Sequence, residues 1–300
     1  MSILNVSPNE PTLDATLWET GRAILNPDAD DQMPLVIIST NACASLNSAL
    51  AAEGIEGDIR YLHAVPHTAR YTREVSVCSG AAPVQIATVP VAGLVFVAID
   101  PQIESDLVVA LSVSRVAREA SLFVVALVAQ ADSSSAARVR ESELLRAFDS
   151  VIALRAAWPE AQALACKIIK HIAGGLKVAP PVCTDLADVQ GILGGAIVTV
   201  GVGESAGSTS ADEMGRAWNA AARAIEDAGC SSVAAATGVI IAIAGNQSVR
   251  LSEISRVTHQ VGDLVESASA FVIPTVHIES NAADLFHVLV LVAQCSHESP

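Results

Sequence analysis

The sequence predicts an α/β fold built around a parallel sheet. Short apolar runs alternate with segments of helical periodicity along most of the chain, and this alternation is typical of strands joined by right-handed helical crossovers. The chain is 51% hydrophobic but only 3% aromatic, so its apolar mass consists of Ala, Val, Ile and Leu. Such residues suit parallel strands that helices bury on both faces.

The first 33 residues are polar and interrupted by proline and aspartate, which predicts a flexible tail with one short helix near residues 17–25. The predicted strands are runs rich in Val, Ile and Leu at residues 34–40, 59–65, 94–99, 123–128, 151–154, 196–203, 237–245, 271–278 and 287–294. The predicted helices have apolar residues three and four positions apart, at residues 46–55, 106–119, 138–148, 161–176, 186–193, 211–227 and 251–265. Residues 75–90 are polar and interrupted, and predict no regular element.

Two glycines at 174–175 and two prolines at 180–181 mark the clearest boundary in the chain, because both residue types end helices. We therefore expect a tail (1–33), a Rossmann-like parallel-sheet domain (34–158), a central helix with its linker (159–182) and an α+β domain (183–300). The carboxyl ends of the strands in the first sheet are where a ligand is expected.

Charge and cysteine content exclude several classes of function. The formal net charge of −15 disfavours nucleic acid as a partner, and no polybasic run is present to hold an anionic membrane. Six cysteines lie far apart without a Cys-x-x-Cys pair, which indicates neither a zinc site nor a disulfide framework. No signal peptide is visible, and the apolar runs of about nine residues are shorter than the roughly twenty of a membrane span. We expect a cytoplasmic protein.

Three blocks of sequence carry a family resemblance. Residues 184–207 read TDLADVQGILGGAIVTVGVGESAG, residues 237–293 contain a strand, a Leu-x-Glu helix and two further strands, and residues 91–129 form a strand, turn, helix and strand. In order and spacing these blocks resemble FtsZ, the bacterial tubulin, from about residue 34 to residue 295. The resemblance implies a tubulin/FtsZ-like fold with a GTP site at the carboxyl ends of the first strands.

The phosphate-binding glycines that the resemblance implies are missing. FtsZ has G-G-G-T-G-T-G where this chain has residues 102–108, and a glycine-rich run where it has residues 40–45. Glycine matters there because its backbone can approach phosphates closely and adopt positive φ. The two carboxylates in the turn, Glu104 and Asp106, are expected to repel a triphosphate, at a cost of about 4 kcal/mol for unit charges about 4 Å apart.

The two residues that should contact guanine match Gln162 and Ala163. The positions of the degenerate pocket are Thr40, Asn41, Asp100, Gln102, Glu104, Ser105, Asp106 and Gln162. We expect no bound cofactor at these positions. The alternative is GTP or GDP with Mg²⁺ held by other residues.

The loop that completes the neighbouring subunit's site in FtsZ, N-x-D-x-x-D, is better preserved. Both aspartates remain, as Asp185 and Asp188, while the Asn is replaced by Cys183. The resemblance implies a catalytic role in trans for the two acids. The alternative is structural, with Asp188 capping the following helix and Asp185 simply solvated.

Other motifs predict no chemistry of their own. Gly201 and Gly203 precede a helix but lack the Lys of a phosphate loop, and they match structural glycines of FtsZ. His63 and His67 flank Pro66, which argues against one helical metal-binding face, so we expect no metal site.

The predicted function is that of a pseudo-GTPase that acts through protein contacts, as a capping protein or a scaffold, with an authentic FtsZ or itself as partner. The alternatives are a divergent GTP-binding FtsZ-like protein that polymerises in cell division, and a small-molecule binder that uses the remodelled pocket. FtsZ normally continues into a linker and a peptide that binds membrane anchors. This sequence ends at Ser299-Pro300, so we expect no direct membrane anchor.

Overall fold

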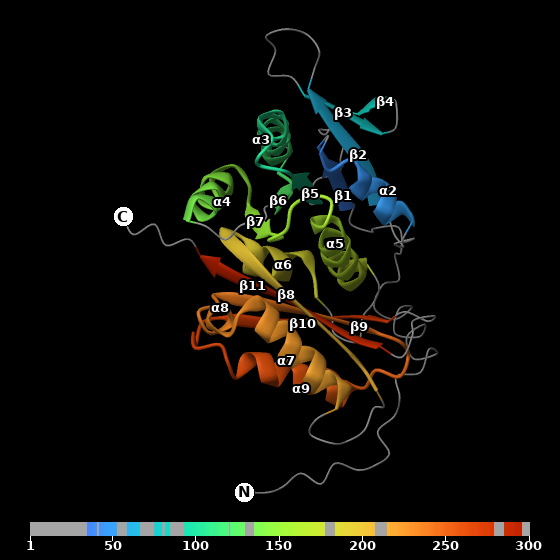
Figure 1. Ribbon diagram of the computed structural model, residues 1–300, viewed down its shortest axis with the longest axis vertical. Helices are drawn as coiled ribbons and strands as arrows, with labels where there is room; N and C mark the ends of the chain where they lie inside the picture. The colour runs from blue at the N-terminus through green and yellow to red at the C-terminus, as the bar shows by residue number, and fades with distance from the viewer. Residues whose placement is uncertain are drawn as a thin grey trace, which may run out of the picture.

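The computed structural model describes residues 35–40, 42–52, 59–66, 75–79, 82–84, 93–119, 121–129, 135–177, 184–207, 215–278 and 285–295. The predicted tail (1–33), Asn41, Cys183 and the two prolines at 180–181 lie outside these ranges. Elements are labelled as in Figure 1.

One sheet runs through the described structure, with strands in the order β10-β9-β11-β8-β7-β6-β5-β1-β2-β3-β4. These strands are β1 (Leu35–Ser39), β2 (Ile59–Pro66), β3 (Val75–Ser79), β4 (Ala82–Val84), β5 (Leu94–Ile99), β6 (Phe123–Val128), β7 (Ser150–Ala153), β8 (Ala196–Ala206), β9 (Gly238–Gly245), β10 (Phe271–Ile278) and β11 (Leu285–Cys295). The pairs from β2 through β8 are parallel, as the alternating pattern predicts. β11 lies antiparallel between β8 and β9, and β10 lies parallel to β9 at the edge.

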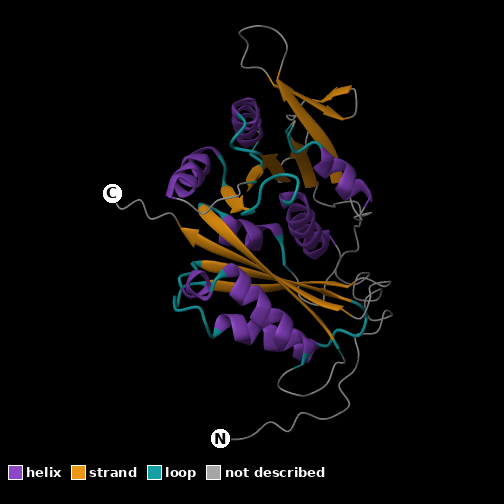
Figure 2. Ribbon diagram, viewed as in Figure 1, coloured by secondary structure: helices purple, strands orange, loops and turns teal. Residues whose placement is uncertain are grey.

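The helices cover both faces of this sheet (Figures 1 and 2). They are α2 (Ser45–Ala52), α3 (Glu104–Glu119), α4 (Ser135–Ala147), α5 (Ala161–Lys177), α6 (Leu186–Leu193), α7 (Arg216–Ala228), α8 (Cys230–Ala234) and α9 (Leu251–Gly262). Helices α3 and α4 pack on one face of the first strands, and α2 and α5 on the other. Helices α7 and α9 cover the outer face of the last strands.

Most predicted elements are confirmed to within a few residues, but the stretch at 75–90 was misread. It contains β3 and β4, which pair antiparallel with each other and with β2 and thereby extend the sheet. These two strands are only five and three residues long. The short helix α8 was also missed.

Strand β8 joins the two halves of the molecule. It pairs parallel with β7, from Ser150 opposite Ala196 to Ala153 opposite Thr199, and antiparallel with β11 over its whole length. The sheet therefore crosses from residues 34–158 into residues 183–300 without a break. The division into domains stays a prediction.

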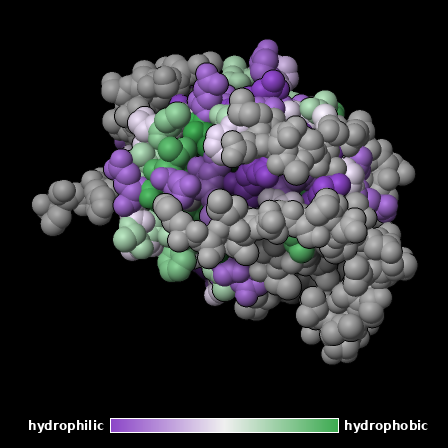
Figure 3. All heavy atoms as spheres, turned by 90° about the horizontal axis from the view of Figure 1, so that it is seen from below, coloured by the Kyte–Doolittle hydropathy of each residue, from purple (hydrophilic) through white to green (hydrophobic). Residues whose placement is uncertain are grey.

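Large hydrophobic side chains are exposed in two places among the described residues. One group lies on or beside α3, and the other on the last third of the chain; they are Ile103, Val108, Leu111 and Val116, and Trp218, Leu251, Leu264 and Phe271. The face viewed from below has hydrophilic side chains across its centre and hydrophobic ones to one side (Figure 3).

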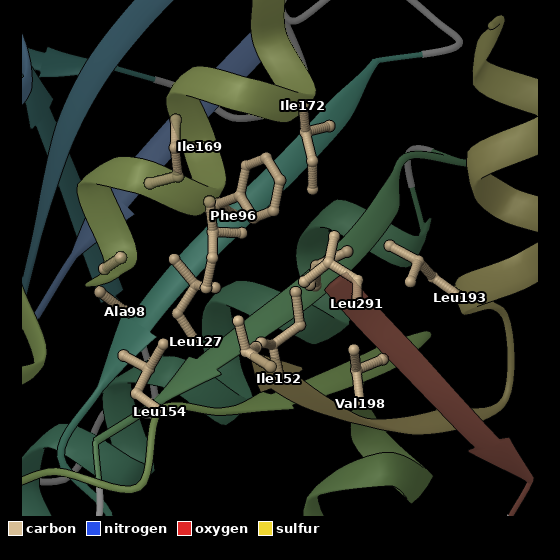
Figure 4. Packing of buried hydrophobic residues seen from close by; sticks show 14 of the residues in the cluster. Phe96, Ala98, Leu127, Ile152, Leu154, Ile169, Ile172, Leu193, Val198 and Leu291 are labelled. Carbon is tan, nitrogen blue, oxygen red and sulfur yellow. The ribbon is translucent and has the colours of Figure 1, made fainter. Parts of the chain in front are cut away.

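The largest core cluster draws side chains from both halves. Phe96, Leu127 and Ile152 of the first strands meet Ile169 and Ile172 of α5, and Leu291 of β11 lies in the same cluster (Figure 4). All of these side chains are at most 2% exposed. Helix α5 thus holds the strands near the candidate site and the last strands in one core.

Candidate functional site

Asp106 lies at the centre of the candidate site, in the first turn of α3 and next to the loop that follows β1. It is only 2% exposed. Its Oδ2 accepts a hydrogen bond from Thr40 Oγ1 at 2.6 Å and another from the backbone N–H of Ala42 at 3.0 Å. Thr40 Oγ1 is also 3.1 Å from the carbonyl oxygen of Ala98. A carboxylate of the protein itself therefore accepts the hydrogen bonds that the loop after β1 donates.

The turn before α3 is shorter than predicted. Helix α3 begins at Glu104 rather than at residue 106, so the turn spans residues 101–103. The backbone N–H of Gln102 donates to Asp100 Oδ1 at 3.0 Å, and that of Ile103 donates to the Asp100 carbonyl at 3.1 Å. Asp100 thus closes the chain into a turn, as Asp side chains do. Acidic residues in the first turn of a helix interact favourably with the helix dipole. This explains why α3 begins two residues earlier than predicted.

The two carboxylates that we expected to face a ligand have different environments. Glu104 is exposed with Gln102 and Ser105, whereas Asp106 is buried. The expected repulsion of a triphosphate by the two acids stays a prediction, and only Asp106 is turned inward towards the loop after β1. Burying a carboxylate costs free energy unless hydrogen-bond donors compensate, and Thr40 and Ala42 supply such donors.

Cys43 lies in the same loop as Ala42, between β1 and α2. It is fully buried, and its backbone N–H donates to the Thr40 carbonyl at 3.1 Å. Burial raises the pKa of the thiol to about 12; the Thr40 hydrogen bond opposes this effect, and the Asp106 and Asp100 carboxylates add to it. Since the thiolate is the nucleophilic form, Cys43 is inert at neutral pH.

Gln162, which matches a guanine-contacting position, is hydrogen-bonded within the protein. Its Oε1 accepts from Ser45 Oγ at 2.5 Å, and Ser45 Oγ accepts from Trp158 Nε1 at 3.3 Å. These contacts join the start of α2 to the start of α5. Sequence reasoning did not identify Ser45 and Trp158 as part of this link, because they lie 113 residues apart.

The residues present are a poor match for a phosphate chain. The backbone N–H of Ala42 donates to Asp106, and the loop has side chains at Thr40, Ala42 and Cys43 where glycines would allow a close approach. Asn41 lies outside the described residues. Among the described residues, no group of three or more His, Cys, Asp and Glu side chains could hold a metal ion.

Asp185 and Asp188 form a reciprocal cap at the start of α6. Asp185 Oδ1 accepts from the Asp188 backbone N–H at 2.8 Å, and Asp188 Oδ2 accepts from the Asp185 backbone N–H at 3.1 Å. The structural alternative is therefore right in kind but wrong in assignment, since Asp185 is the N-cap and Asp188 the third helical residue. Thr184 Oγ1 donates to the Pro274 carbonyl at 3.2 Å and ties this cap to β10.

A basic cleft beside α5 was missed by the sequence analysis. Lys167, Lys170 and His171 of α5 and His287 of β11 are among its lining residues. One signal was available, because all three lysines of the chain, Lys167, Lys170 and Lys177, lie in the segment predicted as the central helix.

Comparison with solved structures identifies the architecture. An FtsZ dimer from M. jannaschii, described as empty, aligns with a TM-score of 0.67 at 15% identity over 92% of this chain and 92% of that chain. The GDP-bound monomer of CetZ1 from Haloferax volcanii aligns with a TM-score of 0.61 at 13% identity over 89% of this chain and 96% of that one. The chain has the tubulin/FtsZ fold.

CetZ2 from the same organism, a GTPγS-bound protofilament, shares the tubulin/FtsZ fold at a TM-score of 0.57 and 16% identity over 89% of this chain and 95% of that chain. No protein-family model and no curated protein matches the sequence. The fold predicted from the three sequence blocks is confirmed. None of the described helices is long and apolar enough to cross a membrane.

Proposed function

We propose that this chain is a tubulin/FtsZ-like pseudo-GTPase that works through protein contacts. The observation that carries the proposal is the buried Asp106 carboxylate, which accepts the hydrogen bonds of Thr40 and Ala42. A phosphate chain in this place would have to displace that carboxylate or lie against it. Two unit charges about 4 Å apart near a protein surface repel by about 4 kcal/mol before screening.

The fold supports an assembly role. Solved structures that share it include a dimer of FtsZ and a protofilament of CetZ2. The proposed partner is an authentic FtsZ filament, which this chain caps, or a second copy of the chain, for which it is a scaffold. By fold analogy alone, we place this activity in the cytoplasm and in cell division.

Titration with nucleotide is the direct test. We expect no heat when the full chain is titrated calorimetrically with GTP or GDP in Mg²⁺ buffer up to millimolar concentration. M. jannaschii FtsZ serves as the positive control under the same conditions. Saturable micromolar binding to the full chain would contradict the proposal.

The capping role predicts that Asp185 and Asp188 contact the filament. The double substitution Asp185→Ser with Asp188→Gln removes both charges but keeps residue types that cap a helix. We expect this variant, and the charge-reversed Asp185→Lys with Asp188→Lys, to lose co-sedimentation with polymerised FtsZ.

Circular dichroism and thermal unfolding provide the control for this experiment. They should show that the Ser/Gln variant keeps its helix content and stability. If both variants sediment with FtsZ as the wild type does, the two acids make no such contact and the capping role fails.

The second candidate is a divergent GTP-binding protein that polymerises. It is favoured by the shared fold of CetZ1 and CetZ2, whose structures contain GDP and GTPγS. On this view other residues hold the phosphates, and Asp185 and Asp188 act on the nucleotide of the adjacent subunit. The same titration separates the two candidates.

A further inference from the structure

The cleft beside α5 has the size and the lining of a small-molecule site. Its volume is about 470 Å³, and it lies between α2, α5 and the ends of β9 and β11. Its lining residues include Ala49, Gln162, Lys167, Lys170, His171 and His287. Small-molecule sites of a few hundred Å³ are typically apolar with a few polar groups that converge. Alanines and the stems of the lysines supply the apolar part here.

The lysines of the protein are concentrated at this cleft. The chain has three lysines and 14 arginines, and all three lysines lie in α5 although the net charge is −15. Lys167 and Lys170 are three residues apart, so they lie on one face of the helix, and both line the cleft. The ammonium group is a compact charge with three donors, which suits a phosphate or carboxylate group.

His171 adds a buried polar side chain with one ring nitrogen that lacks a hydrogen-bond partner in the described part of the chain. The residue is 7% exposed, and its Nδ1 has no hydrogen-bond partner among the described residues. Buried polar atoms are nearly always paired. Burial, followed by His277, His287, Lys170 and Lys167, lowers the pKa of His171 to about 3, so the ring is neutral near pH 7 and offers one donor and one acceptor.

Glu204 of β8 shows that the hydrogen-bond donors beside the cleft can bind a carboxylate. Its Oε1 is 2.5 Å from Lys167 Nζ and 3.2 Å from His287 Nδ1. The hydrogen bond from Lys167 is the main cause that lowers the pKa of Glu204. Two of the residues that line the cleft thus already converge on a carboxylate of the protein.

From this arrangement we infer that the cleft binds a small organic anion, with its phosphate or carboxylate group at Lys170 and His171 and its uncharged part against Ala49 and Ala244. The inference does not rest on the proposed function: the cleft shares Gln162 with the degenerate nucleotide pocket, but Thr40, Ala42 and Asp106 are not among its lining residues. Lys170 and His171, where the anionic group is placed, lie in α5 and outside the loop that holds Asp106.

Calorimetric titration of the full chain with AMP and with malate tests the inference and distinguishes a phosphate from a dicarboxylate. We expect saturable binding of at least one probe, weakened at least tenfold by Lys170→Ala and by His171→Gln. Lys177→Ala is the matched control, because it removes the same charge from the same helix about 10 Å further along the axis. This variant should bind as the wild type does.

Two results would overturn the inference. One is no heat from either probe at millimolar concentration. The other is an equal loss of affinity in Lys177→Ala and Lys170→Ala, because this would indicate attraction to the charge of α5 rather than to a site. Since Lys170 is only half-buried, its variant should fold even if His171→Gln does not.

Discussion

Asp106 and Glu104 are two residues apart and have opposite surroundings. Asp106 is held inside by Thr40 and Ala42, while Glu104 remains in water. Their difference follows from helix geometry, because residues two apart on a helix point in different directions. Of the two acids, only Asp106 accepts the hydrogen bonds of the loop after β1.

His171 makes a residue-scale prediction about pH. Its folded-state pKa of about 3 lies below the ordinary value of 6.5, so the neutral ring contributes stability above pH 6.5 that is lost as the pH falls from 6.5 towards 3. We expect the free energy of unfolding to drop by about 2 kcal/mol between pH 7 and pH 5 because of this group. Urea unfolding at the two pH values measures the drop.

The matched variant for this prediction is His171→Gln, which cannot titrate in this range. Between pH 7 and pH 5, the free energy of unfolding of this variant should fall by about 2 kcal/mol less than that of the wild type. Equal pH dependence in the wild type and the variant would mean that other groups cause the loss.

At the scale of elements, β8 and α7 pack unusually closely. A Cβ atom at Gly203 would lie 1.9 Å from the Ala220 carbonyl oxygen, and one at Gly201 would lie 2.0 Å from that of Ala224. Both obstacles are backbone atoms of α7, which cannot rotate away. These glycines are therefore structural, as their match to FtsZ suggested, since only glycine lets the strand and helix approach so closely.

Gly203→Ala should accordingly destabilise the protein by about 3 kcal/mol, the upper part of the usual range for overpacking. Gly191→Ala is the control, because Gly191 lies in α6 with no atom within 4 Å of a Cβ at that position. This control should be neutral or stabilising by up to about 1 kcal/mol, because alanine favours helix. Urea unfolding of both variants measures the difference, and equal stabilities would refute the close packing.

At the scale of the whole molecule, the continuous sheet and the shared core predict cooperative unfolding. The β7–β8 pair links the two halves through backbone hydrogen bonds, and Leu291 of β11 shares a core with Phe96 of β5. We expect one calorimetric transition with equal calorimetric and van't Hoff enthalpies. Two resolved transitions would show that the halves unfold independently.

Leu291→Ala extends this test, because it creates a cavity in the shared core. Such substitutions cost about 2–5 kcal/mol. Hydrogen exchange should become faster in β5 and β6 as well as in β9 and β11. An effect confined to β9 and β11 would contradict the shared core.

Much of the candidate site was predicted from the sequence, but not its internal contacts. The absence of glycine at residues 102–108 was visible, and so were the two acids of the N-x-D-x-x-D motif. The inward turn of Asp106 was not, because its partner Thr40 is 66 residues away. Likewise, the assignment of the cap to Asp185 needed the hydrogen bond from the Asp188 backbone N–H in the folded structure.

The sequence by itself determined the α/β class, the order of nearly all elements and the tubulin/FtsZ fold, because apolar periodicity and short motifs are local properties of the chain. The tertiary structure decided the strand order that joins β7 to β8, the addition of β3 and β4, the burial of Asp106 and the basic cleft. Apart from the local β3–β4 pair, these depend on contacts between residues far apart in sequence, such as Lys167 and Glu204, 37 positions apart. The local sequence pattern does not specify which distant residues come into contact, because only the packing of the whole chain brings them together.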